Sequence, residues 1–143
     1  MDIKRGIAVS PGVAIGPALV LDTESFRIPQ RSVGPDRVEE EIARVHQALG
    51  EAIRETRETQ DAVNAKLGVQ YGAIFGAHAM MLSDPALERE IDGLVGAQHF
   101  AAEYAVSRVM RRYAKALESI QDENLAGRVS DIFDLEKRVL THL

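Results

Sequence analysis

A helical stripe over residues 35–67 constrains the fold of this chain more than any other feature. Gly34 can serve as N-cap, Pro35 as the first helical residue, and Asp36 as a charge that the helix dipole favours. Apolar residues then recur every three or four positions, at Val38, Ile42, Val45, Leu49, Ile53, Val63 and Leu67. An unbroken helix of this length measures about 50 Å, whereas a compact globule of this chain length has a radius of gyration of about 15 Å. The fold is therefore expected to be elongated.

Shorter helices are expected to follow the long one. Their expected ranges are residues 69–82, 85–94, 101–120 and a last helix that starts at residue 122. Asp84 and Asp122 are the expected N-caps of the second and the last of these, and Pro85 fits a first helical position. Short connections favour antiparallel neighbours. Residues 34–143 therefore predict a mainly α fold, an elongated antiparallel helical bundle.

The first 22 residues have a different pattern. Residues 7–9 and 13–21 are short β-prone runs on either side of the turn signal Pro11-Gly12. Two strands alone do not make a stable sheet in water. Residues 1–22 are therefore predicted to be one or two strands of a domain that this chain does not complete. Residues 23–33 are the expected linker.

Composition excludes several classes of protein. The chain is 45% hydrophobic and 27% charged, as in soluble globular proteins. No apolar run approaches the roughly 18 residues that span a bilayer, so no membrane partner is expected. The net charge of −5 argues against nucleic acid as a partner. The absence of cysteine fits a cytoplasmic protein.

The histidines lack the sequence context of the usual helical metal sites. Di-iron bundles use Glu-x-x-His, but the residues three positions before the histidines are Ala43, Phe75, Gly96 and Val139. There is no HExxH motif, and the SPGVAIG loop lacks the lysine and the following helix of a phosphate-binding loop. We therefore expect no metal, no cofactor and no catalytic residue in this chain.

The stretch AIFGAHAMMLSD, residues 73–84, is the strongest candidate for a functional surface. Two apolar stripes are expected on its helix: Ile74, Ala77, His78 and Met81 on one side, and Gly72, Gly76 and Met80 on another. A helix that is apolar on two sides is either buried all round or offers one side to a partner. Gly68, Gly72 and Gly76 recur every four residues, which indicates close approach either by another helix or by a partner protein.

Together with GIAVSPGVAIG at residues 6–16, this stretch resembles the amino-terminal part of Enzyme I, the phosphoenolpyruvate-protein phosphotransferase of the bacterial sugar phosphotransferase system. In that family a helical domain that docks the phosphocarrier HPr is inserted into a swivelling α/β domain. The α/β domain carries the phosphohistidine in a GG-x-TSH segment. The histidines here read RVHQ, GAHA, AQHF and LTHL. The resemblance thus implies the docking part of a phosphotransferase that is inactive by itself.

The resemblance also implies which residues dock HPr: Ile74, His78, Met80, Met81, Asp84, Leu87 and Arg128. Members of the family often carry acidic residues just before the AIF sequence, where this chain has Val69–Gly72. They also often carry acidic residues after the position of Asp84, where this chain has Pro85-Ala86. The parent protein is expected to need magnesium and to form a homodimer, and this chain is expected to be monomeric. The alternatives are the nitrogen-regulatory relative of Enzyme I, or a helical adaptor unrelated to phosphotransfer.

Overall fold

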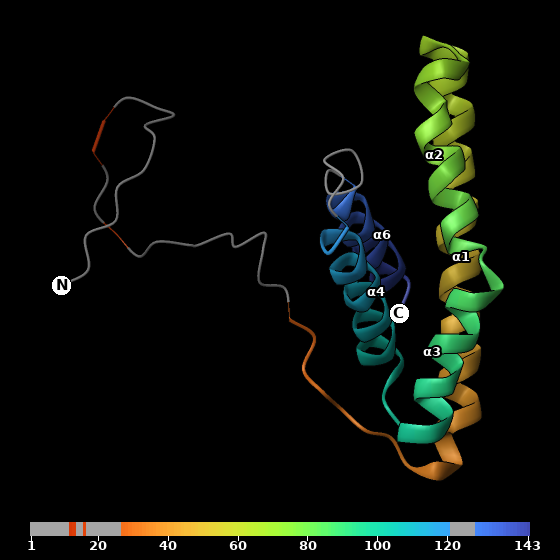
Figure 1. The fold of residues 1–143 in the computed structure, drawn as a ribbon, viewed down its shortest axis with the longest axis vertical. Coiled ribbons are helices and arrows are strands. Elements are labelled where there is room, and N and C mark those ends of the chain that lie inside the picture. Colours follow the sequence, from red (N-terminus) through yellow and green to blue (C-terminus); the bar gives the residue numbers. More distant parts are fainter. Residues whose placement is uncertain (1–11, 14–15, 17–26, 121–127) are drawn as a thin grey trace.

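A computed structural model describes residues 12–13, 16, 27–120 and 128–143 of the chain. These residues contain five α-helices and no strand. After the short 3₁₀ turn η1 (Pro35–Arg37) come α1 (Val38–Leu67), α2 (Val69–Leu82), α3 (Pro85–Gln98), α4 (Ala102–Glu118) and α6 (Val129–Thr141). The long α1 runs beside both α2 and α3, while α4 and α6 pack together on one side of them (Figure 1). The expected elongated, mainly α bundle is confirmed.

The helix ends follow the capping signals of the sequence. α1 ends at Leu67, and Gly68 reverses the chain with a φ of 107°. Asp84 accepts a 2.8 Å hydrogen bond from the Ala86 amide and so caps α3. α3 continues to Gln98, one turn beyond the expected end at residue 94, and His99 stops it with a left-handed φ of 53°. The expected start of the last helix at residue 122 lies outside the described residues.

Glycine sets the distance between α1 and α2. A Cβ on Gly72 would overlap the side-chain oxygen of Asn64 and lie 3.1 Å from the main-chain oxygen of Gln60. A Cβ on Gly76 would lie 2.8 Å from Nε2 of Gln60. Of the two explanations for the glycine repeat, close approach by another helix therefore holds at these two positions.

The apolar stripes of the helices meet in one core. Its most deeply buried members include Val45, Leu49, Leu82, Leu87, Ile91, Val95, Val106, Val109, Ile132, Leu135 and Val139. Their burial removes the apolar side of every helix from water, which is the main force holding such a bundle together. No helix in the described ranges has the length and apolar character needed to cross a bilayer.

A buried carboxylate joins the start of α1 to the start of α4. Glu41 is 1% exposed and accepts a 2.7 Å hydrogen bond from the Ala102 amide, so a residue of α1 caps α4. Arg44 donates hydrogen bonds to Glu41, at 2.8 Å, and to Glu103, at 2.6 Å. Burial by itself would raise the pKa of Glu103, but the hydrogen bond and the positive charge of Arg44 outweigh it and lower that pKa.

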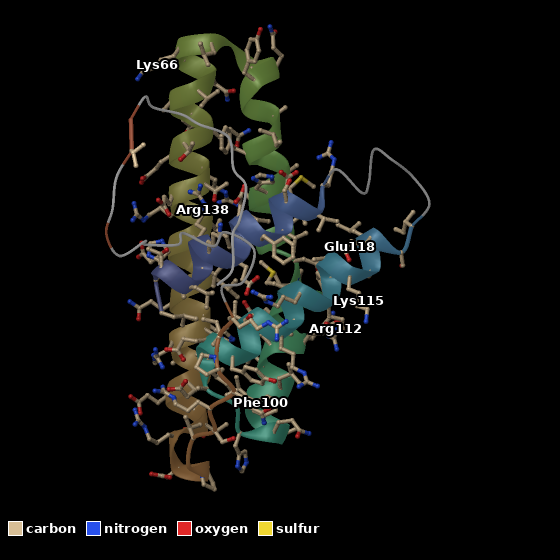
Figure 2. All side chains as sticks on the ribbon, turned by 90° about the vertical axis from the view of Figure 1, so that its left-hand side faces the viewer. Lys66, Phe100, Arg112, Lys115, Glu118 and Arg138 are labelled. Atoms are coloured by element: carbon tan, nitrogen blue, oxygen red, sulfur yellow. The ribbon has the colours of Figure 1, made fainter. Side chains whose placement is uncertain are left out.

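The expected strands at residues 7–9 and 13–21 lie outside the described residues except for Val13 and Gly16, which are not assigned to a strand. Just before α1, Ser32 forms an isolated antiparallel bridge with Phe100, which is labelled in Figure 2. The Val33 amide donates to the His99 carbonyl, and the Ala101 amide donates to the Arg31 carbonyl, both at 2.8 Å. The end of the expected linker is thus fastened to the loop between α3 and α4. The predicted division into domains stays a prediction.

Candidate functional site

The outward side of α2 exposes large apolar side chains. Met80 is 76% exposed, Ile74 42% and Met81 37%. The expected stripe of Gly72, Gly76 and Met80 is not a single face, because Gly72 is buried against α1 whereas Met80 points to solvent. Residues four positions apart on an α-helix are rotated by about 40° about the helix axis. The buried side of α2 therefore passes from Gly72 to Ala79 and Leu82 and does not include Met80. We call Ile74, Met80 and Met81 the apolar patch.

His78 lies at the boundary between this patch and the core. Its side chain is 13% exposed, and its ring meets the edge of the Phe75 ring with centroids 6.2 Å apart. The Nε2 atom is buried, lies 3.6 Å from Oδ2 of Asp131, and has no hydrogen-bond partner among the described residues. His78 and Asp131 therefore face each other across the contact between α2 and α6.

The start of α6 places polar side chains beside the patch. Arg128 is the N-cap residue of α6 and is exposed. Asp131, which contacts His78, lies one turn further along the same helix, about 5 Å along its axis. The structure therefore brings the beginning of α6, with its predicted docking residue Arg128, to the side of α2 that carries His78.

A half-open apolar hollow of about 110 Å³ borders the patch. Its lining residues are Met81, Leu82, Asp84, Leu87, Met110, Tyr113, Ile132 and Leu135. Leu87 is only 2% exposed and belongs to the core, so it supports this hollow from below and is not an exposed contact residue. Asp84 stays exposed while its side chain caps α3.

Sequence reasoning did not single out Asp131 and Tyr113 as parts of this region. Both lie far from residues 73–84 in sequence, and an acidic residue in a first helical turn is commonplace. Burial, reinforced by the nearby Glu90 carboxylate, raises the pKa of Tyr113. The apolar pattern of each helix does not fix the register between α2 and α6, so it could not have paired His78 with Asp131.

One further group has the donor atoms of a divalent-cation site. The side chains of His46, Glu88 and Asp92 come from α1 and α3, and their ligand atoms all lie within 4.8 Å of one another. The expectation that no metal binds was based on spacing within single helices, which cannot detect such an arrangement.

The described fold is that of an all-helical domain built on one long helix. Residues 5–128 match the family described as PEP-utilising enzyme, N-terminal, and the chain belongs to this family. The match confirms the resemblance to the amino-terminal part of Enzyme I.

Relatives in several bacteria extend over almost the whole chain. The phosphoenolpyruvate-protein phosphotransferase of Geobacillus stearothermophilus is 36% identical over 139 residues, which are 97% of this chain and 24% of that protein. Its counterpart in Buchnera aphidicola subsp. Schizaphis graminum is 32% identical over 138 residues, 96% of this chain and 24% of that protein. The chain thus spans about a quarter of the length of these relatives.

Two solved structures share the fold. A solution NMR structure of Enzyme I (nEIt) has a TM-score of 0.76 and 29% identity, covering 83% of this chain and 48% of that chain. A structure described as the N-terminal domain of Enzyme 1 - Nitrogen also has a TM-score of 0.76, with 30% identity over 81% of this chain and 48% of that chain. The two TM-scores are equal, so the fold does not distinguish an Enzyme I from its nitrogen-type relative.

Proposed function

We propose that this chain is the part of a phosphoenolpyruvate-protein phosphotransferase that docks the phosphocarrier HPr. The observation that carries the proposal is the exposure of Ile74, Met80 and Met81 on a helix whose opposite side is packed tightly against α1. Family membership supplies the reaction in which such a surface would serve.

The patch has the physical character of a protein-binding surface. Binding energy in protein interfaces is concentrated in a few apolar anchors surrounded by polar groups. Met80 and Met81 are the anchors here, and methionine adapts its flexible thioether to a partner's shape. His78, Asp84 and Arg128 form the polar surroundings. The hollow beside Met81 is large enough to accept an apolar side chain of the partner.

In the proposed cycle the phosphoryl group passes between a histidine of the parent protein and HPr during sugar uptake in the cytoplasm. The parent protein would bind phosphoenolpyruvate with magnesium and form a homodimer through parts other than these helices. The described chain would be monomeric when separate. A nitrogen-regulatory phosphocarrier is the second candidate partner, since a structural neighbour belongs to that branch. An adaptor unrelated to phosphotransfer is disfavoured by the family match.

Replacement of Met80 by Asp tests the proposal. It places a charge in the centre of the patch and should weaken HPr binding by about 2 kcal/mol or more in calorimetry. Because Met80 is 76% exposed, the thermal melt should change little. Leu67→Asp is the matched control, since Leu67 is 63% exposed at the end of α1 and lies outside the predicted docking residues. Its effect on HPr binding should be negligible.

The same titration with the nitrogen-regulatory phosphocarrier decides between the two branches, because only the cognate partner should bind tightly. Equal weakening by Met80→Asp and Leu67→Asp would contradict the assignment of the patch. If neither phosphocarrier binds the unmodified chain, the docking function itself is wrong.

A further inference from the structure

Three side chains between α1 and α3 form a cluster of metal-binding donors. Glu88 and Asp92 are four residues apart on α3 and therefore lie on the same side of that helix. That side faces α1, where His46 places Nε2 2.8 Å from Oδ2 of Asp92 and 3.8 Å from Oε1 of Glu88. The cluster is separate from the apolar patch, which is formed by α2.

The spacing of these atoms matches the coordination sphere of a small dication. Ligands about 2.1 Å from a zinc ion are separated by roughly 3.4 Å in a tetrahedral site and roughly 3.0 Å at neighbouring octahedral positions. The measured separations of 2.8 and 3.8 Å lie on either side of these values. The ligand atoms of the third pair, Glu88 and Asp92, lie within 4.8 Å of each other. All three side chains are at least 27% exposed, so their tips can move toward a bound ion.

The charges at this place also favour a cation. Two carboxylates at i and i+4 repel each other. In the described ranges the ion pairs of Glu88 and Asp92 are with His46, and none is with a lysine or arginine. Oδ1 of Asp92 is buried and has no hydrogen-bond partner there. Among the described residues, therefore, no lysine or arginine competes with a bound cation for these two carboxylates.

The donor set indicates which metals fit. One imidazole and two carboxylates suit Zn²⁺ and neighbouring transition-metal dications, with water at the remaining positions. Mg²⁺ and Ca²⁺ prefer oxygen ligands alone. We propose that His46, Glu88 and Asp92 form a binding site for a divalent transition-metal ion such as Zn²⁺. The bound ion connects the first half of α1 to the first two turns of α3.

Calorimetric titration of the EDTA-treated chain with Zn²⁺ at near-neutral pH tests the proposal. We expect one zinc ion per chain, and a higher melting temperature with zinc because the ion binds only the folded arrangement. His46→Gln and Asp92→Asn should each reduce the zinc affinity by about tenfold or more. Replacing residues that only hold a metal ligand in place already lowers metal affinity by about 10–100-fold. Excess Mg²⁺ should not displace the zinc.

His142→Gln is the matched control. His142 also lies beside a carboxylate, with Nε2 3.2 Å from Oε2 of Glu55, and its side chain is 26% exposed. It therefore represents a surface histidine paired with one carboxylate, whereas His46 is next to two. The control variant should bind zinc as the unmodified chain does. All variants should melt at similar temperatures in EDTA, since the replaced side chains lie outside the core.

Any one of three results would overturn the site. The first is the absence of zinc binding up to millimolar concentration, which would make the cluster a plain ion pair between His46 and two carboxylates. The second is an equal loss of affinity in His46→Gln and His142→Gln, which would show that zinc binds surface histidines without selection. Zinc binding that survives His46→Gln unchanged would have the same meaning.

Discussion

One substitution, glycine to alanine, should have opposite effects at two helical positions of this protein. Gly50 lies in α1, is exposed, and has no atom within 4 Å of the place where a Cβ would be added. Gly72 lies in α2, is buried, and has its Cβ position filled by α1. Comparing Gly50→Ala with Gly72→Ala distinguishes two effects on stability: the intrinsic helix preference of alanine, and the packing of α2 on α1.

The magnitudes follow from these two environments. Alanine is more favourable than glycine in a helix by about 1 kcal/mol, so Gly50→Ala should stabilise the chain by about that amount. At Gly72 the same gain is opposed by overpacking, which typically costs about 1–3 kcal/mol. The Asn64 side chain can move aside, but the Gln60 carbonyl 3.1 Å away moves only if α1 moves. Gly72→Ala should therefore destabilise by about 1 kcal/mol, a difference of about 2 kcal/mol from Gly50→Ala.

Gly76→Ala provides an intermediate case, because its Cβ would meet only the flexible end of Gln60. We expect it to be nearly neutral. Urea unfolding followed by circular dichroism at 222 nm gives the free energies of all three variants on one scale. If Gly72→Ala stabilises the chain as much as Gly50→Ala does, then α2 is not held against α1 as described, and the packing argument is refuted.

Two further predictions concern protonation and phosphorylation. The pKa of Glu103 is lowered in the folded state, so its ionised form stabilises the protein above pH 4.5, its ordinary value, and this stabilisation is lost as the pH falls through the lowered pKa. Glu103→Gln should thus lower the free energy of unfolding by about 1 kcal/mol at neutral pH. It should also make the melting temperature depend less on pH below 4.5. An unchanged pH dependence would contradict the role of Arg44. Incubation with phosphoenolpyruvate and magnesium, or with phosphorylated HPr, should leave the intact mass unchanged, because Nε2 of His78 is buried against Asp131. Gain of one phosphoryl group that is lost in His78→Asn would make His78 a catalytic residue instead.

Much of the helical architecture could be predicted from local signals. Asp84-Pro85 marks the start of α3, because capping and a preset φ act within a few residues. Gly34-Pro35 marks the start of the 3₁₀ turn η1, and the long helix itself begins three residues later than predicted, at Val38. The repeat of apolar residues likewise indicated which side of α1 is buried, and Val45 and Leu49 are in the core. The end of α3 was placed one turn too early, since the left-handed stop at His99 is a conformation that the sequence signals only weakly for a residue other than glycine.

The candidate site was predicted in part. The sequence located the exposed patch of Ile74, Met80 and Met81 through its apolar pattern and its family resemblance. It could not separate Met80 from Leu87, which were both predicted to dock a partner, although one is 76% exposed and the other 2%. Leu87 lies with Ile91 and Val95 on the single buried side of α3. α2 is apolar on two sides, and its sequence does not indicate which of them another helix covers.

By itself, then, the sequence determined the helices, most of their ends and the apolar side of each one, because these depend on interactions within a few turns. Only the tertiary structure decided which apolar side chains stay uncovered, that Glu41 of α1 caps α4, and that His46 meets Glu88 and Asp92. Those features depend on the register between helices that are distant in sequence. Register is set by the packing of the whole core, which a periodic pattern within one helix cannot specify.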